Sequence, residues 1–130
     1  MTVPESSAAL NGRSQWNGLD ALARDLVRTL DEVGAHTGAV YLLTPDTQVL
    51  ELAVMKGLPR EFVRPWERVS LSTPIPVTDA VREGRLVWVS GEEEMVRRYP
   101  STALTLPYEF ALAAVPLAGA TDVYGGMFVL

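Results

Sequence analysis

The chain has 130 residues, of which 48% are hydrophobic and 21% charged, and its formal net charge at pH 7 is −5. This length fits one globular domain, and the negative charge argues against nucleic-acid binding and against adhesion to acidic membranes. The absence of cysteine excludes disulfides, thiol nucleophiles and thiolate metal sites. Because the sequence has neither a membrane-spanning apolar run nor a secretory signal, we expect a cytoplasmic protein.

The N-terminal part is predicted to form a tail and one long helix. Residues 1–15 lack periodicity and are predicted to be a disordered tail. Residues 16–34 are predicted to be helical, because apolar side chains recur every three or four positions. Two interpretations of this apolar stripe stay open: it covers a sheet, or it forms a homodimer interface. The dimer-interface candidates are Leu19, Leu22, Leu26, Leu30 and Val33.

A β-hairpin is predicted after this helix. Two apolar runs, residues 39–43 and 49–55, flank the turn-forming segment TPDTQ. Pro45 presets φ for a turn, and Asp46 can accept a hydrogen bond from the backbone two residues further on. Since two strands alone are only marginally stable, other elements must cover this hairpin.

The middle of the chain is predicted to fold into short elements. Residues 60–66 are typical of a short helix, and residues 69–72 of an extended segment. Thr73 is expected to cap a second helix that carries Pro74 and Pro76 in its first turn, where a missing N–H costs nothing.

A third strand is predicted at residues 85–90, with the sequence RLVWVS. Ser90 and Glu93 have the spacing of a capping box, which predicts a third short helix that ends before Pro100. Residues 100–109 are expected to form a loop.

A second hairpin is predicted at the C-terminal end, from strands at residues 110–117 and 123–130. We expect it to pair with the first hairpin. The predicted fold class is α+β, with a central, mainly antiparallel sheet. The long N-terminal helix would lie on one face of this sheet, and the short helices and loops on the other.

The sequence resembles a GAF domain over about residues 17–130. The resemblance rests on three segments, GAVYLLTPDTQVLELAVMKGLPREF, STPIPVTDAVREGRLVWVS and ALAAVPLAGATDVYGGMFVL. It is most similar to bacterial GAF domains linked to PAS modules, serine/threonine phosphatases or histidine kinases. We therefore expect one GAF-like domain over residues 16–130, cut short before the C-terminal helix that is usual in the family.

The resemblance implies a sensory or regulatory domain of a bacterial signal-transduction protein. Such a domain would bind a small molecule between the sheet and the short helices, form a homodimer, and modulate an output domain in the same chain or in a partner signalling protein. The alternative is a ligand-free dimerisation module that couples to a phosphatase, kinase or transcription-regulator output.

The resemblance also bears on cofactors and catalysis. Cyclic-nucleotide-binding relatives carry an Asn-Lys-Phe-Asp-Glu constellation, which has no match in this sequence. Covalent bilin attachment and the reduction of free methionine sulfoxide use cysteines in relatives, and this chain has none. We therefore expect no cofactor and no catalytic activity.

No catalytic or metal-binding motif is found in the sequence. His36 is the single histidine, and the acidic run Glu92–Glu94 fits a helix N-terminus better than a metal site. Apolar and aromatic residues are better candidates for a ligand pocket, although the same residues could simply fill the core. The pocket candidates are Met55, Trp66, Trp88, Tyr99, Tyr108 and Phe110.

Overall fold

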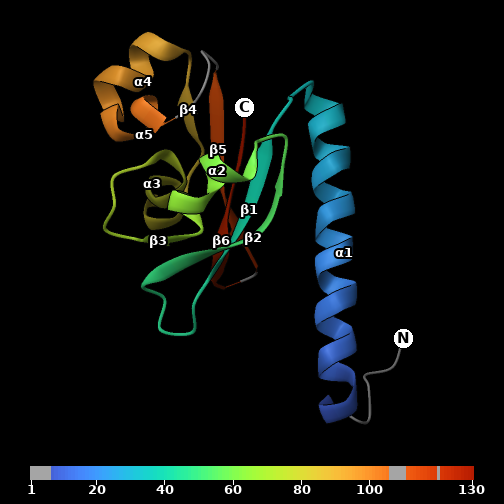
Figure 1. The fold of residues 1–130 in the computed structure, drawn as a ribbon. Helices are drawn as coiled ribbons and strands as arrows, with labels where there is room; N and C mark the ends of the chain where they lie inside the picture. The colour runs from blue at the N-terminus through green and yellow to red at the C-terminus, as the bar shows by residue number, and fades with distance from the viewer. Residues whose placement is uncertain (1–6, 106–110, 120) are drawn as a thin grey trace.

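The computed structural model describes residues 7–105, 111–119 and 121–130, and the side chains of these residues except at 7–17, 19, 60 and 105. Figure 1 shows the long helix α1 on one side of the sheet and the short helices on the other. The elements in chain order are α1 (Ser7–Val33), β1 (Gly38–Leu43), β2 (Val49–Lys56), α2 (Arg60–Val63), η1 (Arg64–Trp66), β3 (Arg68–Ser70), α3 (Pro76–Glu83), β4 (Val87–Val89), α4 (Glu92–Arg98), α5 (Pro100–Thr105), β5 (Leu112–Ala118) and β6 (Val123–Val129).

The strands form one six-stranded sheet with the order β3-β2-β1-β6-β5-β4, and every neighbouring pair is antiparallel. The central pair, β1 and β6, joins the first hairpin to the last, with Gly38 opposite Val129 and Val40 opposite Met127. The predicted α+β fold class and the pairing of the two hairpins are both confirmed.

A β-bulge in β2 interrupts the register of the first hairpin. Tyr41 lies opposite Leu52, and Val40 lies opposite Val54, so Ala53 has no partner on β1. Such an extra residue increases the local twist of a strand. As a result, Leu52 and Met55 both pack against the cluster on the short-helix face, although they are three positions apart.

Helix α1 covers the face of the sheet that carries Val40. Leu26 and Leu30 are buried there, and Leu22 packs against the same cluster. The helix comes close to the strand at Gly38, where an added Cβ would lie 2.9 Å from Cδ2 of Leu30. Among the described helices, none combines the length and the apolarity needed to cross a membrane.

The opposite face of the sheet carries the larger core. It is covered by the short helices, and α3 packs directly on β5 and β6. The close packing of α3 depends on Gly126, where an added Cβ would lie 2.7 Å from Cγ2 of Val77 and 2.8 Å from Cγ2 of Val81. The fully buried members of this core include Ala39, Tyr41, Leu50, Ala80, Val87, Val89, Met95, Leu112 and Ala114.

Two helix boundaries differ from the sequence predictions. Helix α1 begins at Ser7, earlier than the expected residue 16. Residues 100–105, predicted to be part of a loop, form helix α5, in which Pro100 occupies the first position. Proline is well suited to that position because the first N–H of a helix has no intrahelical partner.

Two predicted helix caps are also wrong in detail. Thr73 does not cap α3, because Ile75 is the residue before its first turn. At α4, Glu94 takes the place of the predicted Glu93: its Oε1 accepts hydrogen bonds from the backbone N–H of Ser90 at 2.7 Å and from the Ser90 hydroxyl at 3.0 Å. The N-cap of α4 is Gly91, so Glu94 occupies the third helical position, and its carboxylate bonds to Ser90, one residue before the cap.

Candidate ligand-binding site

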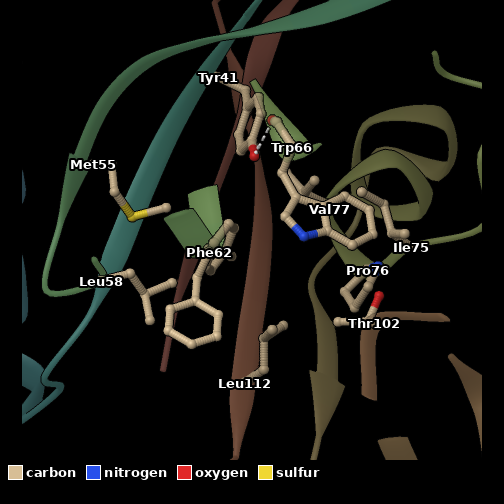
Figure 2. Close-up of a pocket in the computed structure, with 11 residues that line it drawn as sticks. Tyr41, Met55, Leu58, Phe62, Trp66, Ile75, Pro76, Val77, Thr102 and Leu112 are labelled. Atoms are coloured by element: carbon tan, nitrogen blue, oxygen red, sulfur yellow. Dashed lines mark hydrogen bonds between the residues drawn. The ribbon is translucent and has the colours of Figure 1, made fainter. Parts of the chain in front are cut away.

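A small apolar pocket lies between the sheet and the short helices. Its volume is about 40 Å³, which is room for a few water molecules, since one water needs at least about 10–15 Å³. Figure 2 shows Met55, Leu58 and Phe62 on one side of the pocket and Trp66, Ile75 and Val77 on the other. The lining residues are Tyr41, Met55, Leu58, Phe62, Trp66, Ile75, Pro76, Val77, Thr102, Leu112 and Phe128.

Tyr41 is the buried polar group at one end of this pocket. Its side chain is 1% exposed, and its hydroxyl donates a hydrogen bond to the backbone carbonyl of Trp66 at 2.8 Å (Figure 2). Its ring lies against Phe128 with a centroid distance of 6.3 Å. Burial raises the pKa of Tyr41 above its ordinary value, so the hydroxyl stays protonated and remains a donor.

Thr78 fixes the start of α3, which forms one wall of the pocket. Its hydroxyl accepts a hydrogen bond from the backbone N–H of Ile75 at 3.3 Å and lies 2.9 Å from the Ile75 carbonyl oxygen. The same hydroxyl also contacts the carbonyl oxygen of Thr73. These bonds satisfy polar groups that would otherwise be left without partners at a buried helix end.

An open groove adjoins the pocket on the side of β2. Its volume is about 450 Å³, which lies within the range of about 300–1,000 Å³ typical of small-molecule sites. Met55 and Leu58 line both the pocket and the groove. The residues that line the groove are Leu52, Met55, Leu58, Val63, Arg64 and Glu67.

The six pocket candidates from the sequence have different positions in the structure. Met55 and Trp66 line the pocket. Trp88 is 54% exposed, because its neighbours on β4 face the short helices and alternation turns Trp88 to the opposite face. Tyr99 is buried, but its hydroxyl donates to Oδ2 of Asp79 at 2.6 Å and it is not a lining residue.

The last two pocket candidates, Tyr108 and Phe110, lie outside the described residues. Sequence reasoning missed Tyr41 as a pocket residue. A residue with an apolar ring and a polar tip inside a continuous apolar strand is a signal that could have indicated it.

The dimer-interface candidates on α1 divide into two groups. Leu26 and Leu30 are buried against the sheet of their own chain, and Leu22 is half-buried beside them. Val33, near the end of the helix, is 60% exposed. The side chain of Leu19 is not among those described. The stripe thus covers the sheet at Leu26 and Leu30.

Within residues 7–105, 111–119 and 121–130, no three His, Asp or Glu side chains are placed together to hold a metal ion. His36 is exposed, and its backbone N–H donates to the carbonyl of Leu130 at 3.0 Å.

Comparison with known proteins agrees with this architecture. The GAF domain family model matches residues 17–130, and the chain therefore belongs to the GAF domain family. Members of this family are commonly sensory or regulatory domains of signalling proteins. A search of curated proteins found no match to the sequence.

Several solved structures share the fold. The GAF domain of an Acinetobacter phosphoenolpyruvate-protein phosphotransferase is 21% identical, with a TM-score of 0.62 over 85% of this chain and 63% of that chain. A GAF domain/HD domain protein from Geobacter sulfurreducens is 20% identical, with a TM-score of 0.68 over 89% and 76% of the two chains. A type II free methionine-R-sulfoxide reductase from Thermoplasma acidophilum is 12% identical, with a TM-score of 0.64 over 88% and 74%. The present chain thus spans less than two thirds of the Acinetobacter chain, and at these identities the likeness shows the fold alone.

Proposed function

We propose that this GAF domain is a sensory domain that binds a small molecule between the sheet and the short helices and thereby modulates an output domain of a bacterial, cytoplasmic signalling protein. Its role is regulatory and not catalytic. The observation that carries the proposal is the apolar pocket, whose walls come from both hairpins and from α2, η1, α3 and α5.

The position of the pocket suggests how binding would be transmitted. Tyr41 faces the pocket, and its neighbour Val40 faces Leu26 and Leu30 of α1. A ligand that displaces Tyr41 would therefore move the residue next to Val40, which packs against α1. A ligand can change the balance between two packings of this layer only by binding one of them more tightly.

The proposal is tested by exposing the ¹³C-methyl-labelled protein to xenon, a neutral apolar probe small enough for a pocket of about 40 Å³. Apolar cavities in proteins bind probes of this kind. We expect saturable chemical-shift changes at the methyl groups of Met55 and Val77, which line the pocket, and none at Leu104, which is 87% exposed. If no neutral probe shifts the pocket methyls in preference to Leu104, the proposal is wrong.

A second candidate function is that of an interaction module that pairs two copies of the chain or couples to an output domain. The observation that favours it is α1, whose N-terminal part runs past the end of the sheet in Figure 1. On the same helix Val27 is 42% and Val33 60% exposed. If this candidate is right, the Val27→Lys/Val33→Lys protein will have half the wild-type mass in light scattering. An unchanged mass would exclude these residues from an interface.

A further inference from the structure

The groove beside the pocket is lined by four apolar residues and by two residues of opposite charge. Leu52, Met55 and Leu58 supply the apolar surface, and Arg64 and Glu67 are the charged residues that line it. Met55 and Leu58 also line the pocket. An apolar group bound in the groove would therefore contact two residues of the pocket wall.

Arg64 is a positively charged residue that takes part in none of the ion pairs between described side chains. It is exposed on η1. Guanidinium groups bind carboxylates through two parallel hydrogen bonds, a geometry that lysine cannot provide. A carboxylate in the groove would therefore find in Arg64 a two-pronged donor.

Glu67 limits the negative charge of a ligand that can bind in the groove. Its backbone carbonyl is engaged with the N–H of Leu52 at 2.9 Å, which holds this residue to the groove wall. Its side chain adds a negative charge near Arg64, so a ligand with two negative charges would be repelled. A neutral ligand would gain at most a hydrogen bond from the guanidinium, without the attraction between opposite charges.

We propose that the groove binds a monocarboxylate with a short apolar tail. The carboxylate would lie on Arg64, and the tail would lie along Leu52, Met55 and Leu58 towards the pocket. This inference rests on the proposed sensory function and names the ligand class that the site selects. The volume of about 450 Å³ accommodates such a molecule without enlargement of the small pocket.

The first test compares six-carbon probes by NMR titration of the wild-type chain. Hexanoate should bind more tightly than hexanamide, which lacks the charge, and than adipate, which carries a second one. From acetate through butyrate to hexanoate the affinity should rise by up to about fourfold for each methylene that becomes buried. If hexylamine or adipate binds as tightly as hexanoate, the inference is wrong.

The second test uses two charge variants with a matched control. Arg64→Gln should weaken hexanoate binding by about five- to tenfold. Glu67→Gln should tighten it by about two- to threefold, because a like charge is removed. The control is Arg97→Gln, since Arg97 is 70% exposed on α4 and is not a lining residue of either cavity. Weaker hexanoate binding by Glu67→Gln would contradict the proposed charge selection.

The neutral probes separate this inference from the function on which it rests. Xenon should bind wild-type protein and Arg64→Gln equally well, because Arg64 does not line the pocket. If xenon binds but hexanoate does not bind more tightly than hexanamide, the monocarboxylate inference fails and the sensory proposal stands. If neither xenon nor hexanoate shifts the resonances of the pocket and groove methyl groups, both proposals fail.

Discussion

The hydroxyl of Tyr41 lies 2.8 Å from the backbone carbonyl oxygen of Trp66. This hydrogen bond joins the central strand β1 to η1, which contributes residues to both the pocket and the groove. The two residues are 25 positions apart in the sequence, so the bond forms only when the sheet and the short helices have assembled.

We predict that Tyr41→Phe lowers the free energy of unfolding by about 1–2 kcal/mol, because the carbonyl of Trp66 loses its donor in a part-buried site. Urea denaturation measures the loss. The control is Tyr124→Phe, since Tyr124 is 57% exposed and should tolerate the change within about 0.5 kcal/mol. Equal effects of the two variants would contradict a structural role for this bond.

Leu26→Ala should destabilise the domain by about 2–5 kcal/mol, because Leu26 is 2% exposed between α1 and the sheet. Val27→Ala, at the neighbouring exposed position, should change the free energy of unfolding by less than about 0.5 kcal/mol. Urea denaturation and light scattering should be measured together. Loss of a dimer at unchanged stability in Leu26→Ala would show that this residue faces a partner and not the sheet.

Gly126→Ala should cost about 1–3 kcal/mol, because the new methyl group would overlap Val77 and Val81 and push α3 away from β6. Gly18 provides a matched glycine control, since an added Cβ there meets nothing within 4 Å. Gly18→Ala in a helix interior should increase the free energy of unfolding by about 0.5–1 kcal/mol. Thermal and urea denaturation distinguish the two, and a stabilising Gly126→Ala would contradict the close packing of α3.

Stability should depend on pH through Glu94. The backbone N–H of Ser90 and the side chain of Arg98 hold the pKa of Glu94 below its usual value. Because the pKa is lower in the folded state, the contribution of this carboxylate is present above the unfolded-state pKa of about 4.3 and is lost as the pH falls through the folded-state value. Glu94→Gln should lower the melting temperature at pH 7 and flatten its decline below pH 5. Parallel curves for the two proteins would contradict this assignment.

The sequence predicts the strands well because apolar runs and turn-forming residues are recognisable within short segments. The turn of the first hairpin is an example: Asp46 accepts a hydrogen bond from the backbone N–H of Gln48 at 3.2 Å, as its turn chemistry predicts. The sequence does not predict helix α5 because Pro100 disfavours a helix interior, whereas at the first helical position its lack of an N–H is harmless.

The candidate site was harder to predict because its residues come from many elements. The alternation in β4 shows that either Trp88 or its two valine neighbours face the short helices, and only the assembled sheet decides between them. Likewise, Arg64 and Glu67 become candidate binding residues only because the fold places them in one groove with residues of β2. Sequence spacing does not contain these non-local contacts.

The bulge at Ala53 has a consequence for changes in chain length. Because Ala53 has no partner on β1, its deletion would place Leu52 and Val54 next to each other while each kept its present partner. Deletion of a paired residue would instead exchange the two faces of β2 beyond that point. Ala53 is therefore a position at which one residue can be lost between relatives while the helix-facing and pocket-facing side chains keep their sides.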